Sequence, residues 1–274
     1  PIHLTPELPG RLLASEVTRL RPAPAPILIV TDDHVGPLYA DEVCEALEDA
    51  GYIPSCLTLA HGEPSKQLSV VSKVLDEALA LGLTRRDLIV ALGGGVVGDI
   101  AGFSASVLLR GVRYVQVPTT ILSQVDSAVG GKTGVNHTMG KNLIGAFWQP
   151  SAVISSQAVL GTLPERERRC GLAEALKHGL LGDEQLVSWC LTHADQLRAL
   201  DPVLIRELVA RCCRIKAEIV RDDERDAGRR AALNLGHTYG HAYETLLGYG
   251  TLTHGEAVAL GMVWAARLSE ALGV

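Results

Sequence analysis

The first half of the chain alternates short apolar runs with amphipathic stretches, and this alternation restricts the possible folds more than any other feature. The apolar runs lie at residues 27–31, 53–60, 87–95 and 114–120. Between them, residues 39–51 and 66–82 carry apolar side chains three or four positions apart, which is the spacing of a helix with one buried face. Strands that alternate with helices predict a parallel sheet with helices on both faces.

The sequence changes character near residue 160. Beyond this point the strand-like runs end, and stretches with helical spacing lie at residues 163–181, 201–220, 231–248 and 254–273. Thr162 is a candidate cap for the first of these helices, with Pro164 in its first turn. We therefore predict an α/β domain over residues 1–160 and an all-helical domain over residues 161–274.

Composition excludes several classes of protein. The net charge is -6 and no basic run occurs, which argues against a nucleic-acid-binding protein. No apolar run reaches the ~18 residues of a membrane span, and the first residues lack the pattern of a secretory signal. The 6 cysteines form no CxxC pair, which favours small buried side chains in a reducing compartment. We therefore expect a cytoplasmic protein that binds neither nucleic acid nor membrane.

The end of the chain is an apolar helix without a polar tail. A helical domain that ends in this way usually packs against further structure. We therefore expect the native polypeptide to continue beyond Val274, and Pro1 not to be its native start.

A glycine motif follows the third apolar run. Gly93, Gly95 and Gly98 satisfy the G-x-G-x-x-G pattern between a predicted strand and a predicted helix, where glycines let the backbone approach a pyrophosphate. A tight turn uses the same glycines, so both interpretations stay open. The acidic residue expected ~20 positions later is missing, and Asp32 or Glu63 would have to contact a ribose instead. This would be a Rossmann-like nucleotide site with unusual contacts.

Two further segments carry side chains that can bind a cofactor or an anion. Residues 117–120 end in two threonine hydroxyls, which suit either a cofactor contact or the capping of a strand. Residues 125–147 combine glycines with polar side chains, namely Asp126, Lys132, Asn136, His137, Lys141 and Asn142. Lysines and asparagine in a glycine-rich loop are typical of a site for a phosphorylated or polyhydroxy anion. We therefore predict an anion-binding loop there.

Three side chains in the second half suit a catalytic metal. His237 and His254 lie in separate segments flanked by glycine, and Glu174 lies upstream of both. Two histidines and a glutamate from separate segments are typical of a zinc ion that keeps one coordination position open for chemistry. A structural zinc is more often closed by four ligands that include cysteine.

Three neighbouring side chains stay open to more than one interpretation. His241 follows His237 by four residues, so it can be a fourth ligand, a proton carrier or a hydrogen-bonded core residue. Lys177 shares a helix face with Glu174 and is either part of a surface ion pair or a site residue. Lys216 is either a snorkelling lysine or a side chain that points into a cleft.

The chain carries a series of motifs in a fixed order: HGEPSK, ALGGGVVGDIAGFSASVLLRG, VPTTILSQVDSAVGGKTGVNH, GKNLIGAFWQP, TLPERE, GLAEALKHG, IKAEIV, LNLGHTYGHA and HGEAVALGM. In this order they resemble the 3-dehydroquinate synthase family of the sugar-phosphate cyclase superfamily. The resemblance implies an N-terminal nucleotide-binding α/β domain, a C-terminal helical metal-binding domain and an active site between them. It also implies bound NAD, a divalent metal that is usually zinc, with cobalt as the alternative, and a homodimer.

The substrate that the resemblance implies is 3-deoxy-D-arabino-heptulosonate 7-phosphate. Family members convert this sugar phosphate to 3-dehydroquinate and phosphate in the shikimate pathway of aromatic amino acid synthesis. A ring alcohol is oxidised by NAD, phosphate is eliminated, the ketone is reduced, the ring opens and an internal aldol closes the carbocycle. The alternatives are another sugar-phosphate cyclase and a metal-dependent polyol dehydrogenase, which would accumulate NADH.

The resemblance also assigns roles residue by residue. It places the metal ligands at Glu174, His237 and His254. It places the NAD contacts at Asp32, Glu63, Lys66, Gly94, Gly95, Val96, Asp99, Thr119, Thr120, Lys132, Lys141 and Thr162. It places the substrate contacts at Arg110, Asp126, Lys132, Asn142, Lys177, Lys216, Arg230, Asn234 and His241. For His241, this favours substrate contact and proton handling over metal ligation.

The chain departs from the family pattern at a few points. Asp226 stands where the family usually has glutamate, and His34 replaces a commoner asparagine near the adenosine end. Family members continue well beyond Val274, with further helices and another substrate-binding lysine. We therefore expect that the present chain, if it were the whole protein, would bind NAD better than it turns over substrate.

Overall fold

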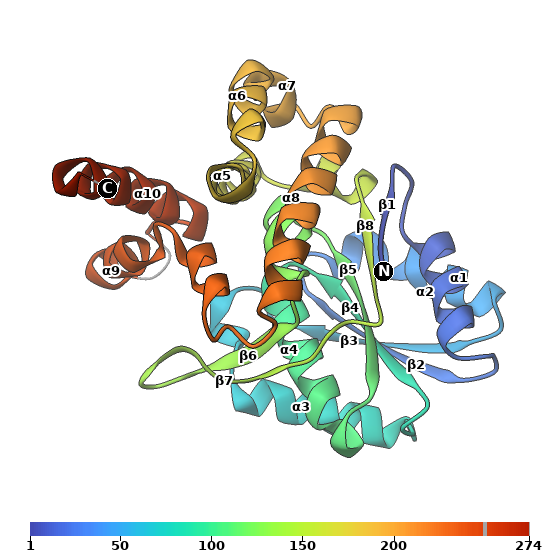
Figure 1. Ribbon diagram of the computed structural model, residues 1–274. Coiled ribbons are helices and arrows are strands. Elements are labelled where there is room, and N and C mark those ends of the chain that lie inside the picture. The colour runs from blue at the N-terminus through green and yellow to red at the C-terminus, as the bar shows by residue number, and fades with distance from the viewer. Residues whose placement is uncertain (249–250, 274) are drawn as a thin grey trace. The chain divides into compact units, whose positions relative to one another are not determined.

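The computed structural model describes residues 1–248 and 251–273, in two compact units (Figure 1). The first unit comprises Pro1–Thr119 and Gly130–Gly161, and the second comprises Thr120–Val129 and Thr162–Val274. The predicted domain ranges, 1–160 and 161–274, stay predictions, and the contact-based units assign Thr120–Val129 to the helical part. We expect the native polypeptide to continue beyond Val274, and this residue lies outside the described residues.

A six-stranded sheet forms the centre of the first unit. All its neighbouring strands pair in parallel, in the order β1-β8-β5-β4-β2-β3. The strands are β1 (Ile2–Thr5), β2 (Pro26–Asp32), β3 (Ile53–Leu59), β4 (Leu88–Gly93), β5 (Arg113–Pro118) and β8 (Ala152–Ser156). The apolar runs predicted as strands are β2, β3, β4 and β5, so the predicted parallel sheet is confirmed. The strands β1 and β8 were not predicted.

Alternate residues of the central strands enter two separate cores. The helices of this unit are α1 (Gly10–Leu20), α2 (Gly36–Asp49), α3 (Leu68–Ala80) and α4 (Gly95–Val107). In β2, Ile27 and Ile29 pack into one core with α1 and α2. Leu28 and Val30 pack into the other core with α3 and α4. Successive side chains of a strand point to opposite faces, so a strand that is buried on both faces is a continuous apolar run in the sequence.

Most of the segment predicted as an anion-binding loop, from Lys132 to Phe147, forms an antiparallel hairpin instead. Its strands are β6 (Lys132–His137) and β7 (Gly140–Phe147). Gly134 and Gly145 face each other across the hairpin, and a Cβ atom on Gly145 would lie 2.2 Å from the Thr133 carbonyl oxygen. These glycines allow two backbones to approach closely. The prediction of a loop was wrong because glycines in this role give no strand signal.

The second unit is helical, as predicted. Its α-helices are α5 (Glu165–Gly182), α6 (Glu184–Thr192), α7 (Ala194–Arg198), α8 (Pro202–Asp222), α9 (His237–Leu247) and α10 (His254–Leu272). Short helical turns along the chain are η1 (Glu63–Ser65), η2 (Leu108–Arg110), the π-helix η3 (Ser123–Ser127), η4 (Ala158–Thr162) and η5 (Arg229–Asn234). In the part of the chain that the structure describes, no helix combines the length and the apolarity needed to cross a membrane.

Close packing explains why the segment around η3 belongs with the helices. A Cβ atom on Gly171 of α5 would lie 2.5 Å from the Ile121 side chain, so glycine lets this segment approach α5. The Cys213 thiol of α8 donates to the Gln124 carbonyl oxygen at 3.3 Å. The segment Thr120–Val129 therefore packs against α5 and α8.

Thr162 does not cap α5, so that prediction was wrong. Thr162 ends η4, and α5 begins at Glu165 behind Pro164, which provides no capping side chain. The backbone at Pro164 is extended, with ψ 146°, and separates Thr162 from the first helical turn.

The hairpin glycines generate a first prediction. Gly145→Ala should lower the free energy of unfolding by about 1–3 kcal/mol, because the new methyl group overlaps the backbone of the opposite strand. Urea unfolding followed by circular dichroism measures this change. Gly161→Ala is the matched control, because a Cβ atom there would meet nothing within 4 Å. Equal stabilities of the two variants would contradict the close approach of β6 and β7.

Candidate functional site

Two histidines and a glutamate of the second unit converge at one point. Glu174 lies on α5, whereas His237 begins α9 and His254 begins α10. The Glu174 Oε1 atom is 3.8 Å from His237 Nε2 and 3.4 Å from His254 Nε2. One candidate ligand atom from each residue lies within 4.8 Å of the other two. The structure thus brings the predicted metal ligands together, and their role as ligands stays a prediction.

Glycines let the three helices approach closely enough for this arrangement. A Cβ atom on Gly255 would lie 2.2 Å from the Cys170 carbonyl oxygen of α5. A Cβ atom on Gly261 would lie 1.9 Å from the Gly236 carbonyl oxygen, just before α9. At both positions α10 therefore packs by its backbone, and Figure 1 shows α9 and α10 running alongside each other.

A capping box fixes the start of α10 and with it His254. The Thr253 hydroxyl oxygen accepts the Glu256 N–H at 3.4 Å, and Glu256 Oε2 accepts the Thr253 N–H at 2.8 Å. Arg166 of α5 donates to Glu256 Oε2 at 2.6 Å. That hydrogen bond is the main reason why the pKa of Glu256 falls to about 2.

Burial and neighbouring charges give the three converging side chains different protonation states. Burial opposes ionisation of Glu174, but its contact with His254 and the charge of Lys177 hold its pKa below the ordinary value. Burial, assisted by the positive charge of Lys177, lowers the pKa of His237 to about 4. Burial also opposes protonation of His254, but its contacts with the carboxylates of Glu174 and Glu244 raise its pKa to about 9. At neutral pH without metal, Glu174 is ionised, His237 is neutral and His254 is protonated.

These donors fit a divalent metal ion. Glu174 is fully buried, and its Oε1 atom has no hydrogen-bond partner of normal geometry among the described residues. A carboxylate oxygen in that state is costly unless a cation or a donor satisfies it. A set of two imidazoles and one carboxylate is typical of zinc and of similar divalent ions.

A cluster of buried charges adjoins Glu174 within the same unit. Lys177 Nζ lies against Glu174 Oε2 and is 3.8 Å from Asp126 Oδ2. Lys216 Nζ donates to Asp126 Oδ1 at 2.6 Å, and His178 Nε2 is 3.4 Å from the same oxygen. Burial would raise the pKa of Asp126, but the charges of Lys177 and Lys216 hold it well below the ordinary value. Burial lowers the pKa of Lys216.

Arg230 adds another buried cation to this unit. Its side chain donates to the Glu224 carbonyl oxygen at 2.5 Å, and its backbone N–H donates to Asp223 Oδ2 at 3.0 Å. The exposed fractions of Arg230, Lys177 and Lys216 are 1%, 1% and 7%. Cations so far from water favour an anionic partner, such as a phosphate or a carboxylate.

The other predicted residues of this unit lie nearer the surface. The exposed His241 ring is edge-on to His237, with 5.5 Å between the ring centroids. This exposure excludes the interpretation of His241 as a core residue. Asn234 and Thr162 are exposed, and Thr120 is half-buried. The contacts predicted for these residues stay predictions.

In the first unit, several predicted residues form one polar network. Lys66 Nζ donates to Asp99 Oδ2 at 2.8 Å and to Asn142 Oδ1 at 2.5 Å. Asn136 extends this network, because its side-chain amide donates to Glu63 Oε1 at 2.7 Å. Its Oδ1 atom accepts the Asn142 N–H at 2.8 Å. The structure therefore brings together four residues to which the family resemblance assigns NAD or substrate contacts.

The glycine turn between β4 and α4 fits a nucleotide phosphate. The helix α4 begins at Gly95, with Gly94 before it and Val96 in its first turn, and it has no capping side chain. The Thr119 N–H donates to the Gly93 carbonyl oxygen at 3.0 Å. Thr119 Oγ1 is buried, and among the described residues it has no hydrogen-bond partner. Uncapped N–H groups near an unsatisfied hydroxyl suit a phosphate or a ribose.

Asp32 has a structural role in the same unit. Its Oδ1 atom accepts the N–H groups of His34 at 3.0 Å and Val35 at 2.9 Å, just before α2. The His34 ring stacks on the His61 ring, with centroids 3.6 Å apart. The NAD contact predicted for Asp32 stays a prediction.

Arg110 lies apart from the other predicted residues of the first unit. It is exposed, has a positive φ of 69° and precedes β5. Because β4 and β5 run in parallel, Arg110 lies at the N-terminal ends of these strands, whereas Gly93 and Thr119 lie at their C-terminal ends. Lys132 and Lys141 lie on the β6–β7 hairpin. The roles predicted for these three residues stay predictions.

Sequence reasoning gave no role to two polar residues that the structure places in these clusters, namely His178 and Glu244. His178 is fully buried and lies one turn after Glu174. Glu244 is buried two turns after His237. Their spacings of four and seven residues place them on the faces of the predicted ligands, which was the available signal.

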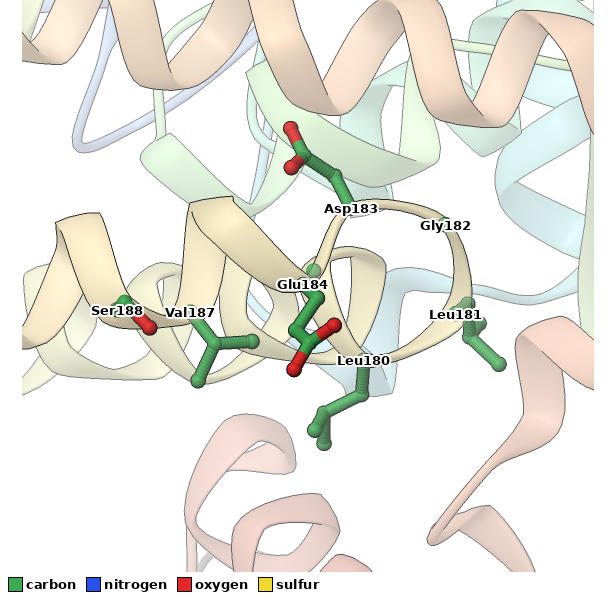
Figure 2. Close-up of a pocket in the computed structure, with 8 residues that line it drawn as sticks. Leu180, Leu181, Gly182, Asp183, Glu184, Val187 and Ser188 are labelled. Carbon is green, nitrogen blue, oxygen red and sulfur yellow. The ribbon is translucent and has the colours of Figure 1, made fainter.

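Figure 2 shows a separate pocket where α5 ends and α6 begins. It is lined by Gly179, Leu180, Leu181, Gly182, Asp183, Glu184, Val187 and Ser188. Asp183 Oδ2 accepts from Arg211 Nε at 3.0 Å, and Asp183 Oδ1 accepts the Leu186 N–H at 3.1 Å. The acidic side chain thus has a structural role, and none of the predicted site residues lines the pocket.

Comparisons with known proteins show similarity to 3-dehydroquinate synthases. The sequence profile described as 3-dehydroquinate synthase N-terminal matches residues 56–170, and the profile described as 3-dehydroquinate synthase C-terminal matches residues 171–274. The 3-dehydroquinate synthase of Desulforamulus reducens is 50% identical over 248 residues. These residues are 90% of this chain and 69% of that protein.

Two solved structures share the fold at 29% identity. One is the 2-epi-5-epi-valiolone synthase of Streptomyces hygroscopicus subsp. jinggangensis with NAD+ and Zn2+ bound, with a TM-score of 0.92. The match covers 100% of this chain and 75% of that synthase. The other is a 2-deoxy-scyllo-inosose synthase in complex with carbaglucose-6-phosphate, NAD+ and Co2+, with a TM-score of 0.87. This match covers 99% of this chain and 74% of that synthase.

The protonation states of the three converging side chains generate a second prediction. Zinc that binds to the metal-free protein at pH 7 should release about one proton per ion, because metal ligands must be deprotonated. His254, with a pKa raised to about 9, must lose its proton, whereas His237, with a pKa near 4, is already neutral. The affinity should therefore rise roughly tenfold per pH unit from pH 5 to pH 8.

Calorimetry in buffers of different ionisation enthalpy counts the released protons. His254→Ala should bind zinc more weakly and release none. Release of two protons per zinc ion, or a zinc affinity that does not change with pH, would contradict a neutral His237 and a protonated His254 in the metal-free protein.

Proposed function

The chain belongs to the 3-dehydroquinate synthase family, and from that premise we propose that it converts 3-deoxy-D-arabino-heptulosonate 7-phosphate to 3-dehydroquinate and phosphate. This is a phosphate-eliminating carbon–oxygen lyase reaction of the shikimate pathway, and it uses NAD and a divalent metal. The observation that carries the proposal is the fully buried Glu174, whose Oε1 faces two imidazoles while its Oε2 faces Lys177.

Glu174, His237 and His254 would hold the metal, with zinc first and cobalt as the alternative. When it is bound, such an ion polarises a substrate hydroxyl or carbonyl oxygen and stabilises negative charge on it. Lys177 contributes by its contact with Oε2, which favours the ionised carboxylate and leaves Oε1 directed at the imidazoles. His237 contributes a neutral imidazole at working pH.

Lys177, Lys216 and Arg230 would supply positive charge for the phosphate and carboxylate groups of the substrate. Asp126 holds the Lys216 ammonium in place through its side chain, at 2.6 Å, and its backbone carbonyl, at 2.7 Å. Charges that are fixed before substrate arrives need little reorganisation during the reaction. His241, an exposed imidazole, can exchange protons with water and would serve as the proton carrier.

In the first unit, the start of α4 would bind the NAD pyrophosphate. NAD supplies a hydride acceptor that is restored within each turnover, so no NADH accumulates. The network of Glu63, Lys66 and Asp99 would orient the nucleotide, and Thr119 would donate its unsatisfied hydroxyl. The proposal keeps the further contacts implied by the resemblance, at Asp32, Thr120, Lys132, Lys141 and Thr162 for NAD and at Arg110, Asn142 and Asn234 for substrate.

Another sugar-phosphate cyclase is the second candidate, since two cyclase structures share this fold. The higher identity to a curated 3-dehydroquinate synthase favours the first candidate. We extend the proposal to a homodimer, on the family resemblance alone. We also extend it to the cytoplasm, where the 6 free cysteines would stay reduced.

The proposed reaction gives a third prediction. Incubation with the heptulosonate phosphate, NAD and zinc should release phosphate without net NADH, and a chelator should stop the release. A phosphate-release assay, with absorbance at 340 nm followed in parallel, measures both products. Accumulating NADH would instead indicate a polyol dehydrogenase, and turnover of only a different sugar phosphate would indicate another cyclase.

The buried cations give a fourth prediction. Lys216→Met should lower kcat/KM by about 10²-fold or more, because a preorganised charge is lost at the anion site. Lys73→Met is the control, because Lys73 is an exposed lysine on α3. Circular dichroism checks that both variants are folded. Unchanged kinetics in a folded Lys216→Met variant would remove Lys216 from the site.

A further inference from the structure

His254 lies between two carboxylates, of which Glu174 is only one. Its Nε2 atom is 3.4 Å from Glu174 Oε1, on the side that faces His237. Its Nδ1 atom is 3.9 Å from Glu244 Oε2. Glu244 comes from α9 and has an exposed fraction of only 6%. The two ring nitrogens therefore face two different acidic side chains.

A histidine that binds a metal through one nitrogen usually donates the N–H of the other to a carboxylate or a carbonyl. That hydrogen bond selects the tautomer, fixes the ring orientation and increases the basicity of the ligating nitrogen. Glu244 is the carboxylate on the Nδ1 side of His254. The close packing of α9 on α10 holds it there, since a Cβ atom on Gly240 would lie 3.2 Å from the Ala257 carbonyl oxygen.

We propose that Glu244 is a positioning residue of the metal site, and that its carboxylate accepts the Nδ1–H of His254 so that Nε2 stays directed at the metal. This inference rests on the proposed function in one respect, namely that Glu174, His237 and His254 are the metal ligands.

A rival arrangement uses the same residues differently. His241, Glu244 and His254 also offer ligand atoms within 4.8 Å of one another. In that arrangement Glu244 would be a ligand itself, and the ion would lie on the Nδ1 side of His254. The geometry favours the positioning role, because the fully buried Glu174 faces both His237 and His254 through one oxygen that has no normal hydrogen bond among the described residues.

The test measures Co2+ binding to the metal-free protein by competition with a chromophoric chelator, together with the visible spectrum of bound Co2+. Glu244→Ala should weaken binding by about 10- to 100-fold, the range found for partners of metal-bound histidines. The shape of the Co2+ spectrum should be kept, because all three ligands stay in place. Glu244→Gln keeps an acceptor oxygen and should lose less affinity than Glu244→Ala.

Glu270→Gln is the matched control, since Glu270 is an exposed carboxylate on α10. Circular dichroism checks that each variant is folded. If Glu244→Ala does not fold, weaker Co2+ binding by Glu244→Gln supports the inference, and wild-type Co2+ affinity of Glu244→Gln overturns it. If Glu244→Gln and Glu244→Ala are both folded and both bind Co2+ with wild-type affinity, the inference is overturned. A changed Co2+ spectrum in Glu244→Ala also overturns it and supports the rival arrangement.

Glu174→Gln separates this inference from the proposed function. If Glu174→Gln keeps wild-type Co2+ affinity, the proposed ligand set itself is wrong. If Glu174→Gln loses the metal while the Glu244 variants keep it, the ligand set stands and only the role of Glu244 is refuted.

Discussion

The carboxylate of Glu174, fully removed from water, is the constraint on which the rest of the second unit depends. Such a group is stable only if nearby charges and donors replace the lost hydration. Lys177, one turn along the same helix, covers one oxygen, and the imidazoles of His237 and His254 lie near the other. The lysine in turn approaches Asp126, which is held by Lys216. The buried polar groups therefore form one connected system.

Backbone packing makes this system possible. The helix α10 touches α5 at Gly255 and the start of α9 at Gly261, and a methyl group at either position would overlap a carbonyl oxygen. The capping box of Thr253 and Glu256 then fixes the residue at which α10 begins. The imidazoles are thus positioned by the main chain of three helices. A site built on rigid elements keeps its geometry better than one on loops.

The first unit combines backbone N–H groups with buried polar side chains. The uncapped start of α4 offers those groups, and Lys66 ties α4 to the β6–β7 hairpin through Asp99 and Asn142. Asn142 has a positive φ of 55°, a conformation that asparagine tolerates better than most residues. Its hydrogen bonds to Lys66 and Asn136 hold that conformation in place.

Local patterns in the sequence determined the parallel sheet, the helical second half and the glycine turn before α4, because periodicity and turn chemistry are properties of neighbouring residues. They also singled out Glu174, His237 and His254, whose residue types are unusual together. The sequence could not show that Gly134 and Gly145 belong to a hairpin or that Thr162 leaves α5 uncapped. Nor could it show that His178 approaches Asp126 or that Glu244 approaches His254. Only the tertiary structure decided these points, because each depends on which backbones pack against one another.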